Sequence, residues 1–398
     1  MLKQPGGTAL VFAASGAFQA SWMSRLPAFQ DQVDAGVADL GMALALLGAG
    51  TVIGMFGTGR IFHRVGTRQV VLYASTASSA MLVAIAVAPS PVPFTVATFV
   101  LGMTTGSLDT AMNVHAIAVE KRYERHLMTR FHGMWSVGSV VGASSSIFFA
   151  SRGELSILVQ CVVWAAMTIA LCQLGGRSFD RRDDTPKTLV APVSLSPRLA
   201  TLATIILLGA IIEGAANDWL TILLADVHDM PHMSAAIGYT VFVGAMAVGR
   251  LGAHRLHRWI SNGRLSNPAW RSMLRRDRAV QVGVAVSMVG VWTTVFGPVG
   301  FGLYVGIACW ALGICILFPA VLSAAGSERG AGAAVAVLST VGYGAGMLGP
   351  LTFGVPSVVG RSASTLGYGL AVVLPLLGLA VVGLARWIRT PAVVPSAS

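Results

Sequence analysis

Charged residues are scarce in this sequence. Asp, Glu, Lys and Arg make up 11% of its 398 residues, whereas 55% of the residues are hydrophobic. An ordinary soluble domain carries about 25% charged residues, which help to cover its surface in water. A chain with so few polar residues lacks such a surface, but it has enough apolar residues to face lipid. The composition therefore argues against a soluble protein and predicts an integral membrane protein.

Several signatures of enzymes and pumps are also missing. The sequence has no P-loop, no HExxH, no GxSxG elbow and no Cys/His set with zinc spacing. We therefore expect neither an enzyme nor an ATP-driven pump, and no cofactor or metal site. The remaining power source is an ion gradient or the gradient of the solute itself. The four cysteines form no CxxC motif, and we interpret them as small apolar residues of membrane spans.

Long apolar stretches fill most of the chain. Each is close to the roughly 20 residues that a helix needs to cross the hydrocarbon core of a bilayer. They run at about 8–28, 38–58, 70–88, 93–118, 131–150, 156–174, 199–224, 234–253, 279–297, 300–324, 331–355 and 364–386. The N-terminus leads straight into the first stretch without a small-residue cleavage site, so we expect that helix to be retained. The pattern predicts an all-α membrane protein with about twelve transmembrane helices.

The basic residues alternate between the two sides of these predicted spans. With the N-terminus in the cytoplasm, 24 of the 27 Lys and Arg residues fall on the cytoplasmic side. The other side receives only Arg25, Arg152 and Arg361. This distribution follows the positive-inside rule and predicts a multi-pass inner-membrane protein with both termini in the cytoplasm. The net charge of +11 is then explained by topology, and we expect no nucleic-acid partner.

One long polar, Pro-containing segment divides the chain. Residues 175–198 separate two blocks of six predicted spans and are interpreted as a cytoplasmic linker. The predicted organisation is an N-terminal six-helix bundle over 1–174 and a C-terminal six-helix bundle over 199–388. Residues 389–398 would form a cytoplasmic tail.

The two blocks resemble a parallel repeat. GRIFHRVGTR (59–68) follows the second span and GRLGAHRLHR (249–258) follows the eighth, and in both a Gly-Arg pair precedes a His-Arg pair. GAFQASW (16–22) in the first span similarly matches GAANDW (214–219) in the seventh. Two pseudo-symmetric bundles related in this way place a solute cavity between them, near the bilayer midplane.

Apart from Asp39 at the outer edge of the second span, three acidic residues fall within predicted spans: Asp109, Glu213 and Asp218. A charge at the bilayer centre costs at least about 2.5–3.5 kcal/mol, so such residues usually face a polar cavity and act there. Asn113 and Asn217 follow Asp109 and Glu213 by four residues and share their helix faces. We predict that Asp109 and Glu213 carry coupling protons, and that Asp218 and the two asparagines contact solute. The alternatives are a structural Asp109 bonded to its neighbours and an Asp218 that reaches the external interface.

Other polar or aromatic residues of the spans are candidate solute contacts. These are Gln19 and Trp22 in the first span, Ser136 in the fifth, Trp310 in the tenth and Tyr343 in the eleventh. Trp22 could instead belong to an interfacial aromatic belt, and Trp310 and Tyr343 could be packing residues. Arg25, at the outer end of the first span, could pair with Asp218 or attract an anionic solute. We favour a side chain that snorkels to the headgroups.

GRIFHRVGTR resembles the motif G-x-x-x-D-R-x-G-R-[RK], which the major facilitator superfamily carries in the loop between its second and third helices. The residues that match in place are Gly59, Arg64, Gly66 and Arg68, while His63 stands at the Asp position and Thr67 replaces the first basic residue of the final pair. The resemblance implies a gating role for Gly59, His63, Arg64, Gly66 and Arg68, and for Arg250 and His254 in the second copy. A pH-sensitive gate at the two histidines and simple divergence both stay open.

The stretch LGMTTGSLDTAMNVHAIAVE, followed by FHGMWSVGSVVG, is more specifically similar to bacterial transporters near the fucose permease group. The family implies two six-helix bundles, alternating access and often proton symport. We therefore expect a monomeric carrier in the lipid bilayer that moves a small polar organic solute together with protons. The alternatives are a proton-antiport exporter of a metabolite or toxic compound, and a membrane receptor that kept the fold but lost transport.

Overall fold

The structure is a computed structural model of the chain. It describes residues 3–124, 127–152, 156–179, 196–261, 276–325 and 363–388, together with part of 334–353. The predicted linker lies mostly outside the described residues, as do the eleventh span in part and the C-terminal tail.

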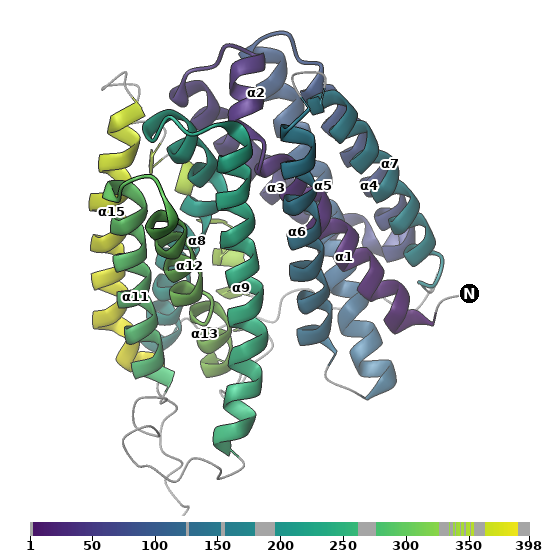
Figure 1. Cartoon of the computed structure of the whole chain (residues 1–398). Helices are drawn as coiled ribbons and strands as arrows, with labels where there is room; N and C mark the ends of the chain where they lie inside the picture. Colours follow the sequence, from purple (N-terminus) through teal and green to yellow (C-terminus); the bar gives the residue numbers. More distant parts are fainter. Residues whose placement is uncertain are drawn as a thin grey trace, which may run out of the picture.

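Helices make up nearly all of the described chain, as predicted (Figure 1). The first half contains α1 (Gln4–Met23), α2 (Leu26–Gln32), α3 (Val37–Val65), α4 (Thr67–Ala86), α5 (Pro91–Tyr123), α6 (Met128–Ala150) and α7 (Ser156–Gly176). The second half contains α8 (Pro197–Ile222), η1 (Leu223–Val227), α9 (His232–Ser261), α11 (Arg276–Phe296), α12 (Phe301–Ile314), α13 (Leu317–Ala325), α15 (Ala363–Leu384) and η2 (Ala385–Ile388).

Among the described residues, ten helices are long and apolar enough to cross a membrane. They coincide with ten of the predicted spans. The other two predicted spans correspond to α1 and to the partly described residues 331–355. The fold is therefore an all-α membrane fold of the predicted kind.

Two helix boundaries differ from the sequence expectation. The motif at 59–68 is not a loop, because α3 continues to Val65 and α4 begins at Thr67. Only Gly66 separates the two helices, with a φ of 80° that favours glycine. The tenth span is broken into α12 and α13, and Pro319 lies in the first turn of α13. Because proline has no N–H, it interrupts the hydrogen-bond ladder of a continuous helix.

Glycines allow the helices of the first half to pack with their backbones close together. A methyl group on Gly102 of α5 would overlap the Leu47 carbonyl oxygen of α3, and one on Gly50 of α3 would overlap the Phe99 carbonyl oxygen of α5. Gly138 of α6 approaches the backbone of α1 in the same way. Such close approach of small residues is typical of membrane helix interfaces, which lack a hydrophobic driving force.

The described helices form two packed groups. The first consists of α1 to α7 and the second of α8 to α15, and α6 and α9 pack against each other between them (Figure 1). We call the end of the molecule that carries α2 the α2 end, and the opposite end the linker end, because the described residues next to the linker, 179 and 196, lie there. The main buried core joins residues of both groups, whereas a second core belongs to the first group alone.

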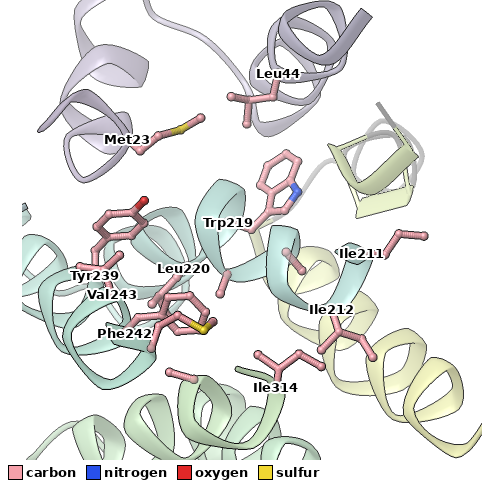
Figure 2. Close-up of a cluster of buried hydrophobic side chains, with 14 of the residues drawn as sticks. Met23, Leu44, Ile211, Ile212, Trp219, Leu220, Tyr239, Phe242, Val243 and Ile314 are labelled. Atoms are coloured by element: carbon pink, nitrogen blue, oxygen red, sulfur yellow. The ribbon is translucent and has the colours of Figure 1, made fainter. Parts of the chain in front are cut away.

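The shared core closes the two groups against each other at the α2 end. Trp219 of α8 is fully buried, and its indole ring points toward Met23 of α1 and Leu44 of α3 (Figure 2). Polar contacts lie next to this core: Gln30 of α2 donates to Asp226 of η1 over 2.9 Å, and Asp31 lies 3.2 Å from His232 of α9. The second core, which includes Phe12 of α1 and Phe131 of α6, lies toward the linker end.

Candidate functional site

Glu213 lies in the middle of α8, facing α9. The Arg250 guanidinium of α9 donates to its carboxylate, with 2.7 Å between Nη2 and Oε1. The side chains keep exposed fractions of 29% for Arg250 and 26% for Glu213, so accessible space borders the ion pair. An isolated charge in a membrane-spanning helix has a high free-energy cost. The ion pair lowers that cost for both side chains.

A tyrosine that no sequence pattern indicated lies next to this ion pair. Tyr239 of α9 is buried, and its hydroxyl donates to the Asn217 side-chain oxygen over 3.2 Å. The Asn217 amide in turn donates to the Glu213 carbonyl oxygen over 3.2 Å. Asn217 is therefore held in one orientation, one turn along α8 from Glu213. The i, i+4 spacing of Glu213 and Asn217 gave the correct helix face, but nothing in the sequence pointed to Tyr239.

Asp218 lies on a different face of α8. Its Oδ2 atom is 3.9 Å from the position that a Cβ atom would take on Gly214, and also 3.9 Å from that position on Gly349. The side chain is partly exposed and, within the part of the chain that the structure describes, makes no hydrogen bond or ion pair. Asp218 thus differs from Glu213, whose carboxylate is paired.

Asp109 lies in α5 of the first group. Asn113 donates its side-chain amide to the Asp109 carbonyl oxygen over 2.9 Å and to the carboxylate over 3.3 Å. The predicted pairing on one helix face is therefore present. Further along α5, Glu120 accepts the backbone N–H of Met128 over 3.0 Å and also that of Leu127. Glu120 therefore satisfies free N–H groups at the start of α6, which is the usual role of a helix cap.

The other predicted solute contacts lie in different environments. Gln19 of α1 is partly exposed. Trp22 is 1% exposed and packs edge-on against Phe29 of α2, with 6.5 Å between the ring centroids, so it does not lie in an interfacial belt. Ser136 is buried, and its hydroxyl donates to the His132 carbonyl oxygen over 3.2 Å.

Trp310 of α12 is fully buried in helix packing. Its indole N–H donates to the Ile212 carbonyl oxygen over 3.3 Å, and its ring meets Phe242 edge-on at 5.9 Å. This geometry corresponds to the packing alternative rather than to a solute contact. Tyr343 lies outside the described residues.

Arg25 departs from the expectation of a snorkelling side chain. It lies between α1 and α2 with an exposed fraction of 4%, so its guanidinium is inside the protein. It does not pair with Asp218 either, because Asp218 forms no ion pair within the described chain. Burial at the turn between two helices that pack into the shared core explains the difference.

The chain is similar to known proteins in both sequence and fold. Residues 8–350 match the family described as Major Facilitator Superfamily. The chain belongs to this superfamily. An uncharacterized MFS-type transporter of Yersinia pestis is 28% identical over 89% of this chain and 88% of its own length. An uncharacterized transporter of Sinorhizobium fredii is 30% identical over 87% of this chain and 89% of its own length.

Solved structures of the same fold confirm the architecture. A crystal structure of a mutant of the nucleoside transporter NupG superposes with a TM-score of 0.73 and 14% identity, covering 96% of this chain and all of that one. A bacterial homolog of the lysosomal transporter Spinster superposes with a TM-score of 0.72 and 13% identity, covering 96% of this chain and 94% of that one. The protein is thus a multi-pass membrane transporter of the major facilitator superfamily and not an enzyme.

The superfamily motif residues lie at the linker end. Gly59, Arg64, Gly66 and Arg68 occupy the end of α3 and the start of α4. His63 and His254 are in helices α3 and α9, but their side chains fall outside the described part. We expected Arg250 to act with the second copy of this motif. In the structure it forms an ion pair with Glu213 between α9 and α8. No described group of His, Cys, Asp or Glu is placed to hold a metal ion.

Proposed function

We propose that this transporter moves a small polar organic solute across the inner membrane by proton-coupled symport. The observation that carries the proposal is the ion pair between Glu213, near the middle of one membrane-spanning helix, and Arg250, in the last turn of the apolar span of another, with accessible space beside both side chains. Asp109, hydrogen-bonded to Asn113 in the opposite bundle, is proposed as a second coupling acid.

The pair links a proton to a solute through electrostatics. If Glu213 takes up a proton, its attraction for Arg250 is lost and a guanidinium is left unpaired inside a membrane helix. An unpaired charge in that environment is costly, so a hydrogen-bond acceptor on the solute stabilises it. Solute binding and protonation then favour each other, which is the thermodynamic requirement for symport. Asn217 and Tyr239, held beside Glu213, are proposed to contact the same solute.

The closure at the α2 end supports alternating access. At the α2 end, the shared core and the contact between Gln30 and Asp226 hold the two bundles together. We propose that residues 1–174 rock against 199–388, so that this closure opens while the linker end closes. The distribution of 24 basic residues to one side and 3 to the other supports a cytoplasmic linker end and cytoplasmic termini. We also propose that the protein acts as a monomer.

The test uses purified protein in proteoliposomes of known orientation. A thermal-shift screen against metabolite classes first identifies a solute that stabilises the protein. Solute uptake is then measured under an imposed pH gradient, with a pH-sensitive dye inside the vesicles. Wild-type protein is expected to carry protons and solute in the same direction. Glu213→Gln and Asp109→Asn are expected to abolish proton-driven uptake per amount of folded protein in the vesicles.

Glu124→Gln provides the matched control, because it makes the same chemical change at an exposed acid beyond the end of α5. Unchanged proton-driven uptake in both Glu213→Gln and Asp109→Asn would contradict the assignment. Proton movement opposite to the solute would replace symport with antiport export. A stabilising solute that is never transported would favour the receptor alternative.

A further inference from the structure

The three acids that the sequence places deep within membrane spans differ in the partners of their carboxylates. Glu213 pairs with Arg250, and Asp109 accepts a hydrogen bond from Asn113. Asp218 is the exception, because within the described residues its carboxylate has neither a hydrogen-bond donor nor a cation as a partner. A charged carboxylate in a membrane protein is stable only when a proton or a positive group accompanies it.

The groups around Asp218 leave room for such a partner. Gly214 and Gly349 border the carboxylate, and neither has a side chain to fill the space beside Oδ2. Tyr239 lies within electrostatic range of Asp218, but its hydroxyl donates to Asn217. Among the described residues, the carboxylate is therefore bordered by two glycines and bonded to no donor.

Asp218 is also separate from the proposed coupling pair. It lies five residues after Glu213, which corresponds to about 7.5 Å along the helix and a rotation of roughly 140°. Glu213 faces Arg250 of α9, whereas Asp218 faces Gly349 in the partly described span after α13. One solute can therefore meet Asp218 while a proton acts at Glu213.

We infer that Asp218 recognises a positively charged group of the solute, and that the solute class is one bearing a protonated primary amine. The inference rests on the proposed transport function and specifies its solute. A primary ammonium group is a compact cation with three donors, so it fits beside a carboxylate that is flanked by glycines. A hydrogen bond between charged groups is also roughly twice as strong as one between neutral groups.

The test compares ammonium compounds with neutral counterparts of similar shape. The probes are glucosamine and glucose, ethanolamine and ethylene glycol, and putrescine and 1,4-butanediol, with binding measured by thermal shift and calorimetry. Wild-type protein is expected to bind the ammonium member of at least one pair about tenfold or more tightly. Asp218→Asn keeps the shape but removes the charge, and is expected to abolish that preference.

A second variant fills the space instead of removing the charge. Gly349→Ala places a methyl group 3.9 Å from the carboxylate, a distance that is tolerated without a clash, and it is expected to weaken ammonium binding. Gly344→Ala is the matched control, because a methyl group there meets nothing within 4 Å. An ammonium preference that survives Asp218→Asn, or no preference in any pair, would overturn the inference.

The two proposals fail separately. Glu213→Gln is expected to keep the ammonium preference but to lose proton-driven uptake. If wild-type protein transports an ammonium probe without moving protons, the coupling proposal fails and the inference about Asp218 stands. If protons drive uptake only of neutral solutes, coupling stands and the inference fails.

Discussion

Arg250 of α9 and Glu213 of α8 are 37 positions apart in the sequence, yet their side chains meet at 2.7 Å. The arginine follows Gly249 and begins the second copy of the superfamily motif, which would place it at the end of its helix. Because α9 continues to Ser261, Arg250 lies well inside the helix and reaches across to α8. The residue is thus part of the coupling site that we propose.

Removing either partner of this pair should destabilise the protein more than removing both. Arg250→Gln leaves Glu213 unpaired, and Glu213→Gln leaves Arg250 unpaired, whereas the double variant leaves no charge behind. Contacting residues of this kind typically show coupling energies of about 0.5–3 kcal/mol. Reversible unfolding in mixed micelles measures the four free energies of unfolding.

The mixed-micelle cycle includes Arg250→Lys, which keeps the charge but loses the planar geometry of the guanidinium. It should retain more stability than Arg250→Gln. Additive free energies across the cycle would show that the two side chains do not interact in the folded protein.

The polar contacts at the α2 end should control access from that side. Gln30→Ala together with Asp31→Asn removes the contacts to Asp226 and His232. Exposed pairs contribute about 0–1 kcal/mol each. We therefore expect the equilibrium between the closed and the open α2 end to shift several-fold toward the open form, rather than a complete opening. The readout is maleimide labelling of Met23→Cys, a residue that is buried beside Trp219 (Figure 2).

Native cysteines set the background of the labelling experiment. Cys161, Cys172 and Cys315 are buried, so only the partly exposed Cys309 is replaced by alanine. Met23→Cys in this background gives the reference rate. Faster labelling of the variant from the α2 end is the expected outcome. An identical rate would show that the apolar core alone holds this end closed.

Helix packing in the first bundle should be sensitive to a single methyl group. Gly102→Ala brings its Cβ onto the Leu47 backbone, which cannot move aside as a side chain could. Overpacking of this kind typically costs about 1–3 kcal/mol. Gly57→Ala in α3 is the control, because a methyl group there meets nothing within 4 Å. The melting temperature should fall for the first variant and stay near the wild-type value for the second.

The membrane spans could be predicted because their signal is local. Apolar stretches of about 20 residues and the alternation of basic loops can both be read from short segments of the sequence. In lipid, each span must also make its backbone hydrogen bonds within itself. Helix ends were less predictable. The motif at 59–68 continues α3 because only Gly66 adopts a conformation that interrupts the helix.

The candidate site was predictable only where its residues share a helix. The spacings of Asp109 with Asn113 and of Glu213 with Asn217 follow from helix geometry and are found in the structure. Tyr239 and the partner of Glu213 were not predictable, because they come from a neighbouring helix whose rotation the sequence does not state. Trp310 looked equally suitable for a cavity, but the structure packs it against Phe242.

The sequence by itself determined that this chain is a helical membrane protein, which superfamily it resembles, and which few acids its spans contain. Each of these depends on local hydrophobicity or on a motif. Only the tertiary structure decided which acid is paired and which is not, because that depends on how α8 and α9 are rotated and placed beside each other. Arg250 therefore neutralises Glu213, while Asp218, five residues further on, faces Gly349 without a partner among the described residues.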